Sequence, residues 1–120
     1  MAEKFLELIG LSTRFGKVTA LDDVSLDVAR GEVVCIIGPS GCGKSTLLRA
    51  ANWLTPPDAG TVRLNGSVVG SAPERRVTGA HIRALNSNRA QIGMVFQQFN
   101  VWKHMPAIEN VTRAQVDDLR

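Results

Sequence analysis

The hydrophobic pattern of the chain consists of short apolar runs separated by turns that are rich in glycine, proline and asparagine. Positions 5–11 alternate loosely and positions 24–28 alternate strictly, which is the period of a strand with one buried face. Positions 33–37 and 92–96 are apolar throughout, a pattern typical of strands that are buried on both faces. The pattern therefore predicts half-buried strands near the N-terminus and two fully buried strands further along the chain.

Glycine-containing turns are expected between several of these strands. Residues 13–17 are predicted to form a turn with Gly16 at its hinge, before a strand over 21–28. Asn65-Gly66 follows a short strand at 61–64, and Asn-Gly favours a two-residue turn between antiparallel strands. The sequence thus predicts a small antiparallel subdomain.

Three helices are predicted from the remaining pattern. The first covers positions 46–54 and ends before Pro56-Pro57, because proline cannot continue a helix. A short helix is expected over 81–88. A third begins over 106–111, since proline is tolerated in a first helical turn.

Composition adds limits to this outline. The chain has 120 residues, of which 44% are apolar and 21% charged, an ordinary globular balance that suits one domain. The net charge is only +3 and Arg75-Arg76 is the sole basic doublet, so we expect solvated loop charges there and no nucleic-acid partner. No apolar run approaches the ~18 residues of a membrane span, and the N-terminus does not resemble a signal peptide. We therefore expect a cytosolic protein with reduced thiols.

One nine-residue segment carries most of the functional information. Residues 38–46 read Gly-Pro-Ser-Gly-Cys-Gly-Lys-Ser-Thr and match the phosphate-loop pattern G-x-x-x-x-G-K-[ST]. The segment lies between a predicted strand and a predicted helix, which is the context this pattern needs to bind a nucleoside triphosphate. The residues expected to bind ATP here are Gly38, Pro39, Ser40, Gly41, Cys42, Gly43, Lys44, Ser45 and Thr46.

The residue types of this loop suit a magnesium-bound triphosphate. Its glycines allow the backbone to bend around phosphates and to present successive N–H groups. The helix that follows adds unpaired N–H groups and the positive end of its dipole. Lys44 would contact the β- and γ-phosphates, and Ser45 would place its hydroxyl on Mg²⁺.

The two cysteines show no metal-binding spacing. Cys35 lies in a predicted buried strand, so we expect an inert thiol. Cys42 lies inside the phosphate loop, where a thiol reagent should modify it and bound ATP should protect it. The alternative explanation for Cys42 is that its side chain is simply small enough for the loop.

Several segments together resemble the nucleotide-binding subunits of ATP-binding cassette transporters. The resemblance covers nearly the whole chain and rests on 21–26 with Gly31-Glu32, 38–49 (Walker A and its helix), 57–60 with Asn65-Gly66, 92–100 (the Q-loop) and 104–111. It implies an α/β fold: a P-loop NTPase core with a small antiparallel β subdomain over residues 1–100. Residues 101–120 would form the exit of the Q-loop and the start of a helical subdomain, which is truncated in this sequence.

The resemblance also implies roles for two residues outside the phosphate loop. Phe15 matches the aromatic residue that stacks on adenine; the alternative is that its ring belongs to the local core. Gln97 matches the glutamine that helps to hold Mg²⁺ and senses the γ-phosphate, which makes Gln97 and Lys44 the candidate catalytic residues. The alternative is an ordinary loop glutamine.

Partners follow from the same resemblance, which is strongest to importers of polar amino acids. Residues 99–104 match the surface that meets the membrane permease subunits, and Trp102 is either an exposed contact or part of the core. The full-length protein would form a homodimer at the cytoplasmic face of the plasma membrane. A separate extracytoplasmic substrate-binding protein and the permease would select the substrate.

The sequence departs from the family by containing no Leu-Ser-Gly-Gly-Gln signature, Walker B strand, catalytic glutamate or switch histidine. We therefore expect an N-terminal fragment that binds Mg-ATP and hydrolyses it negligibly by itself. One alternative is a nucleotide-binding module without hydrolysis. Another is a P-loop kinase, which the antiparallel segment and Gln97 argue against. A soluble cassette protein of DNA repair or translation is a further alternative.

Overall fold

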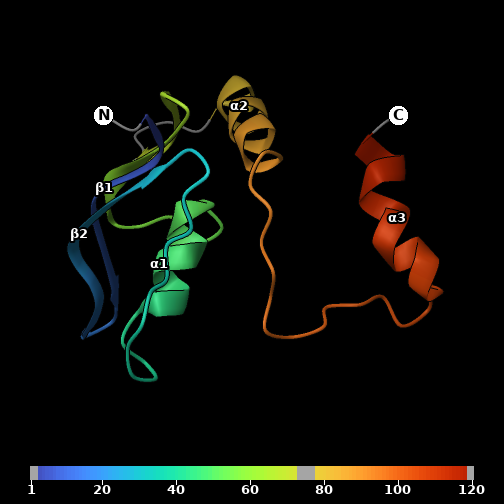
Figure 1. The fold of residues 1–120 in the computed structure, drawn as a ribbon, viewed down its shortest axis with the longest axis horizontal. Helices are drawn as coiled ribbons and strands as arrows, with labels where there is room; N and C mark the ends of the chain where they lie inside the picture. Colours follow the sequence, from blue (N-terminus) through green and yellow to red (C-terminus); the bar gives the residue numbers. More distant parts are fainter. Residues whose placement is uncertain (1–2, 73–77, 119–120) are drawn as a thin grey trace.

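A computed structural model describes residues 3–72 and 78–118 as an antiparallel sheet, two helices that contact it and one further helix (Figure 1). The strands run in the order β2-β1-β3-β4, and all three pairings are antiparallel. The strands are β1 (Lys4–Phe15), β2 (Val18–Ala29), β3 (Ala59–Leu64) and β4 (Ser67–Ala72). The helices are α1 (Lys44–Ala51), α2 (Gly79–Arg89) and α3 (Ala107–Asp118).

Both expected turns are present, but the first is limited to residues 16–17, because residues 13–15 belong to β1. Phe15 pairs with Val18 across the first turn, where Gly16 has a φ of 60° that suits glycine. Asn65 and Gly66 have φ angles of 50° and 82°, as required at both central positions of a type I′ hairpin turn. The small antiparallel subdomain predicted from the sequence therefore exists.

The core lies between the sheet and α1. The strict alternation predicted for 24–28 is borne out, because its apolar side chains are half-buried and its polar side chains exposed. Strands and helix together bury the side chains of Leu8, Leu11, Leu21, Val62, Leu64 and Val69 from the sheet against Leu47, Ala50 and Trp53 from α1 and its exit. This packing places the N-terminal end of α1 beside the β1–β2 turn.

Trp53 is the largest side chain of the core and is only 1% exposed. Its backbone adopts a left-handed conformation with a φ of 54°, which ends the helix and turns the indole ring onto β4. The ring lies directly on the backbone of Gly70, where a Cβ atom would overlap it. Gly70 is therefore required for the close approach of the ring and the sheet.

The two continuously apolar runs do not form the buried strands that the sequence predicted. Residues 33–37 and 92–96 have no regular structure, and Val33, Ile37 and Val95 are 88%, 93% and 97% exposed. A strand needs a neighbour for its N–H and C=O groups, and the described residues provide none for these runs. Cys35 is accordingly exposed, so the expectation that its side chain is buried is wrong.

The helix predictions hold with shifted limits. The predicted helix over 46–54 begins earlier, at Lys44, and ends at Ala51, because Trp53 already has a left-handed backbone. The expected helix over 81–88 is α2, and Thr78 caps it by accepting a hydrogen bond from the His81 amide. The third predicted helix is α3. Arg75 and Arg76 lie outside the described residues.

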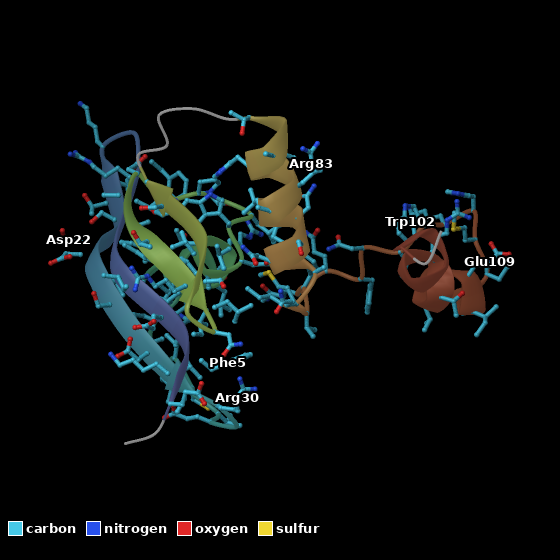
Figure 2. All side chains as sticks on the ribbon, turned by 90° about the horizontal axis from the view of Figure 1, so that it is seen from above. Phe5, Asp22, Arg30, Arg83, Trp102 and Glu109 are labelled. Carbon is cyan, nitrogen blue, oxygen red and sulfur yellow. The ribbon has the colours of Figure 1, made fainter. Side chains whose placement is uncertain are left out.

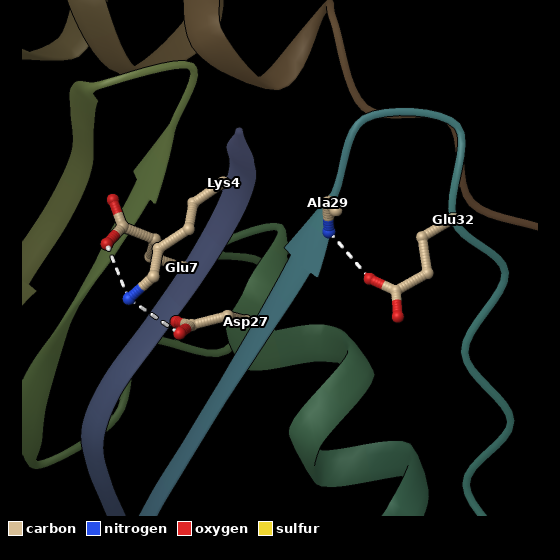
Figure 3. Close-up of polar contacts among 5 residues, drawn as sticks. All are labelled: Lys4, Glu7, Asp27, Ala29 and Glu32. Atoms are coloured by element: carbon tan, nitrogen blue, oxygen red, sulfur yellow. Dashed lines mark hydrogen bonds and ion pairs between the residues drawn. The ribbon is translucent and has the colours of Figure 1, made fainter. Parts of the chain in front are cut away.

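Charged and aromatic contacts tie the strand ends together. The Lys4 ammonium lies 2.8 Å from Asp27 and 3.9 Å from Glu7, and its hydrogen bond to Asp27 raises the pKa of Lys4 (Figure 3). Glu32 accepts a 2.7 Å hydrogen bond from the Ala29 amide. The Arg30 guanidinium lies 4.5 Å from the centre of the Phe5 ring (Figure 2). Such exposed pairs contribute little stability, so the core holds the fold.

Replacing Gly70 with alanine should destabilise the chain, because the added methyl group enters the space of the Trp53 ring. We expect the free energy of unfolding in denaturant to fall by roughly 1–3 kcal/mol, as in other overpacked cores. Gly93→Ala is the matched control, since a Cβ at Gly93 meets no atom within 4 Å. Equal stability of Gly70→Ala and wild type would contradict this account of the core.

Candidate functional site

A cavity of about 520 Å³ lies between the β1–β2 turn and the N-terminal end of α1. It brings together the phosphate loop, the aromatic residue of the hairpin and the glutamine that follows the second apolar run. Its lining consists of Phe15, Val18, Thr19, Ala20, Ser40, Gly41, Cys42, Gly43, Lys44, Ser45, Thr46 and Gln97. Nine of the eleven candidate site residues predicted from the sequence, all except Gly38 and Pro39, therefore face one space.

The backbone of the phosphate loop explains its glycines. Gly41 and Gly43 have φ angles of 78° and 101°, and Gly43 directly precedes the first residue of α1. A Cβ at Gly43 would lie 2.5 Å from the Ala20 carbonyl oxygen, so only glycine allows the loop to lie against β2.

The first turn of α1 is suited to an anion. No side chain caps its N-terminal N–H groups, and it contains no acidic residue. These unpaired donors and the positive end of the helix dipole lie at the cavity. A phosphate placed there would accept hydrogen bonds from backbone groups that otherwise have no partner in the helix.

Lys44 holds the loop in its curved shape. Its ammonium donates hydrogen bonds of 2.7 Å to the carbonyl oxygens of Gly38 and Pro39, and it lies 3.3 Å from the Cys42 sulfur. Gly38 and Pro39 thus contribute through their carbonyls although they do not line the cavity. The two carbonyl acceptors carry no charge, and none of the lining residues is acidic. The lining carries one positive charge, which favours an anionic ligand.

Phe15 marks the other end of the cavity. Its side chain is 53% exposed, so the alternative that the ring belongs to the core is wrong. Val18 is 65% exposed and pairs with Phe15 in the hairpin register, which places both side chains on one face of the ribbon. Val18, Thr19 and Ala20 also line the cavity and were not predicted from the sequence. Their position directly after the Gly16 turn, opposite Phe15, is the sequence feature that could have identified them as lining residues.

Gln97 lines the main cavity and also a second one of about 320 Å³. The second cavity is bounded by Arg49 of α1 and by Phe96, Gln97, Gln98 and Asn100. Ser45 and Gln97 are neutral oxygen donors that suit Mg²⁺. Among the described side chains, those of residues 3–72 and 78–113, no three His, Cys, Asp or Glu form a metal-binding cluster. Ser45 and Gln97 therefore fit a magnesium ion that is already bound to phosphate oxygens, but not a free ion.

None of residues 99–104 lines the main cavity, although Asn100 bounds the second one. Trp102 lies beside α3 (Figure 2). Phe99 is 96% exposed. The backbone of Trp102 is fixed by the Asn110 side chain, which accepts from the Trp102 amide at 2.8 Å and donates to its carbonyl at 3.2 Å. Because the Trp102 side chain is half-exposed, the alternative that Trp102 is part of the core is wrong.

Comparison with known proteins decides the family. A family model described as ABC transporter matches residues 21–120. The chain belongs to the ABC transporter family. Its fold is the one expected from the sequence, an ATP-binding cassette with its antiparallel subdomain, and solved cassettes of this family share it.

Individual relatives in the ABC transporter family give the extent of the match. The chain is 45% identical over 113 residues to the arginine/ornithine transport ATP-binding protein AotP of Pseudomonas aeruginosa, covering 92% of this chain and 44% of AotP. It is 39% identical over 121 residues to the histidine/lysine/arginine/ornithine transport ATP-binding protein HisP of Escherichia coli, and the match covers 99% of this chain and 47% of HisP.

Solved ABC cassettes match to a similar extent. The dimeric structure of the ATP-binding cassette MJ0796 bound to ADP and Pi is 32% identical, with a TM-score of 0.77, and the match covers 96% of this chain and 48% of that one. The chain thus spans about half the length of the relatives it matches. Within the described part of the chain, no helix is both long enough and apolar enough to cross a membrane.

Labelling of Cys42 should report occupation of the cavity. Both cysteines are exposed, so a maleimide should modify both, but only Cys42 lines the cavity. We expect Mg-ATP to slow modification of Cys42 and to leave modification of Cys35 unchanged, as measured by mass spectrometry of the digested protein. The variants Cys35→Ser and Cys42→Ser show which modification rate belongs to which cysteine. Equal labelling of Cys42 with and without nucleotide would contradict the placement of the ligand.

Proposed function

We propose that this chain binds Mg-ATP through residues 38–46 as the N-terminal part of the ATP-binding subunit of an importer for polar amino acids. The observation that carries the proposal is the single cavity in which a helix N-terminus, Lys44, Ser45, Gln97 and Phe15 meet. Its donors and its positive charge suit a triphosphate, and the exposed ring of Phe15 suits a nucleobase.

In this proposal each residue has a separate task. The backbone of the loop and Lys44 bind the phosphates, and Lys44 exchanges its bonds to loop carbonyls for bonds to phosphate oxygens. Ser45 and Gln97 hold Mg²⁺, which neutralises charge on the phosphates when it is bound. Phe15 stacks on the adenine ring. Lys44 and Gln97 are the residues of this segment that would act in hydrolysis.

The role in import is supported by the relatives. AotP and HisP are named for the transport of arginine, ornithine, histidine and lysine, and MJ0796 was solved as a dimer. We infer that the full-length protein forms a homodimer and binds permease subunits through residues 99–104, at the cytoplasmic face of the plasma membrane. An extracytoplasmic substrate-binding protein would deliver the amino acid. In this assignment residues 1–100 form the nucleotide-binding core, and 101–120 begin the helical subdomain.

Lys44→Ala should weaken Mg-ATP binding by about 10- to 100-fold, since a hydrogen bond to a charged group contributes roughly 1.5–3 kcal/mol. Calorimetric titration of the purified chain with a non-hydrolysable ATP analogue and Mg²⁺ measures the affinity. Lys103→Ala is the control, because Lys103 is exposed and does not line the cavity. Unchanged affinity in Lys44→Ala, or no binding to wild type, would overturn the proposal.

Hydrolysis by the 120-residue chain should be negligible, although the family consists of ATPases. The sequence contains neither the catalytic glutamate that polarises water in this family nor the signature motif that completes the binding site for the phosphates. Phosphate release from radiolabelled ATP should match that of Lys44→Ala, and vanadate should trap no nucleotide. Vanadate-sensitive turnover by the wild-type chain would contradict this expectation. A labelled small-molecule acceptor would instead identify a P-loop kinase.

A further inference from the structure

The exit of α1 is held by a side chain from a distant part of the sequence. Arg89, the last residue of α2, donates from Nε to the Asn52 carbonyl oxygen at 3.3 Å and from Nη2 to the Trp53 carbonyl oxygen. These carbonyls follow the last helical residue of α1, where unpaired C=O groups and the negative end of the helix dipole attract a cation. Arg89 therefore caps the helix whose other end forms the phosphate loop.

The carbonyls that Arg89 binds belong to a rigid part of the molecule. Trp53 is 1% exposed with its ring on Gly70, and Asn52 is 8% exposed. Arg89 itself is only partly buried and reaches this point from outside the core. Its planar guanidinium matches two successive carbonyls, so it fixes both the position and the direction of the chain that leaves α2.

The chain that leaves Arg89 leads to the nucleotide cavity. The Ile92 amide donates to the Arg89 carbonyl at 3.0 Å, and Ile92 packs at the edge of the core. Beyond Ile92 the described chain forms no helix or strand until α3, yet Gln97 lines the cavity together with Lys44 and Ser45. The contacts of Arg89 and Ile92 thus hold the chain a few residues before Gln97.

We propose that Arg89 is a positioning residue for the nucleotide site: by capping the carbonyl end of α1, it fixes the chain from which Gln97 reaches the magnesium ion. The inference rests on the proposed binding of Mg-ATP. Arg89 acts through Gln97 and does not itself line the cavity. Loss of the cap leaves the phosphate loop unchanged and lets Gln97 move away from Ser45.

The proposal predicts that loss of Arg89 weakens the binding of ATP only when magnesium is present. In Arg89→Ala, affinity for Mg-ATP should fall by about 3- to 10-fold, the usual range for coupling through intervening structure. Affinity for ATP in EDTA should not change, because the loop and Lys44 bind the phosphates without Gln97. Arg89→Lys should restore part of the loss, since an ammonium can still donate to these carbonyls.

A double-mutant cycle with Gln97→Ala decides whether Arg89 acts through Gln97. We expect Arg89→Ala to cause no further loss of Mg-ATP affinity in the Gln97→Ala background. An equal loss in both backgrounds, or no loss in either, would overturn the proposal. Failure of the wild type to bind Mg-ATP at all would instead refute the proposed function and this inference with it.

Two variants on α2 serve as controls. Asn88→Ala removes the 3.0 Å hydrogen bond from α2 to the Val68 carbonyl, and Arg83→Ala removes an exposed cation of the same helix (Figure 2). Both should bind Mg-ATP like the wild type. A loss in Asn88→Ala equal to that in Arg89→Ala would show that any loosening of α2 suffices, and would overturn the specific role of Arg89. If Arg89→Ala does not fold, Arg89→Lys and Arg89→Gln replace it in the double-mutant cycle with Gln97→Ala.

Discussion

Packing of the Trp53 ring on the backbone of Gly70 is the contact on which the position of the phosphate loop depends. It fixes the C-terminal end of α1 against the sheet, and the contact of Gly43 with Ala20 fixes the N-terminal end. A helix is rigid over this length, so two fixed ends determine where its free N–H groups lie. The site therefore depends on two glycines. Gly70 allows the Trp53 ring to lie on the sheet, and Gly43 allows the loop to lie against the Ala20 carbonyl.

The charges at the two ends of α1 are arranged consistently. A cation, Arg89, lies at the carbonyl end, while the amide end has free donors, Lys44 and no acidic side chain. This distribution follows the helix dipole and leaves a cavity that favours a negative ligand. In the absence of phosphate, the Lys44 ammonium is satisfied by loop carbonyls, which keeps the loop curved around the place that an anion would take.

The exposed apolar runs show a different constraint. Val34 and Ile36 face Leu48 of α1, whereas Val33 and Ile37 point to solvent. Residues 33–37 are thus placed over α1 as a strand would be, but no described segment pairs with them. Gln97, which follows the second run, is consequently held by local anchors and not by a sheet, and this explains the importance we assign to Arg89.

The sequence alone determined the local features of this protein. Asn65-Gly66 requires positive φ angles, the glycines and Lys44 of the loop form a phosphate site by local geometry, and α2 and α3 follow from local pattern. Only the tertiary structure decided that Phe15, Gln97 and the loop share one cavity, and that Arg89 caps α1, because these contacts join segments far apart in the chain. It also decided that residues 33–37 and 92–96 stay unpaired: apolar side chains make a strand possible, but hydrogen bonds from a neighbouring strand are needed to form it.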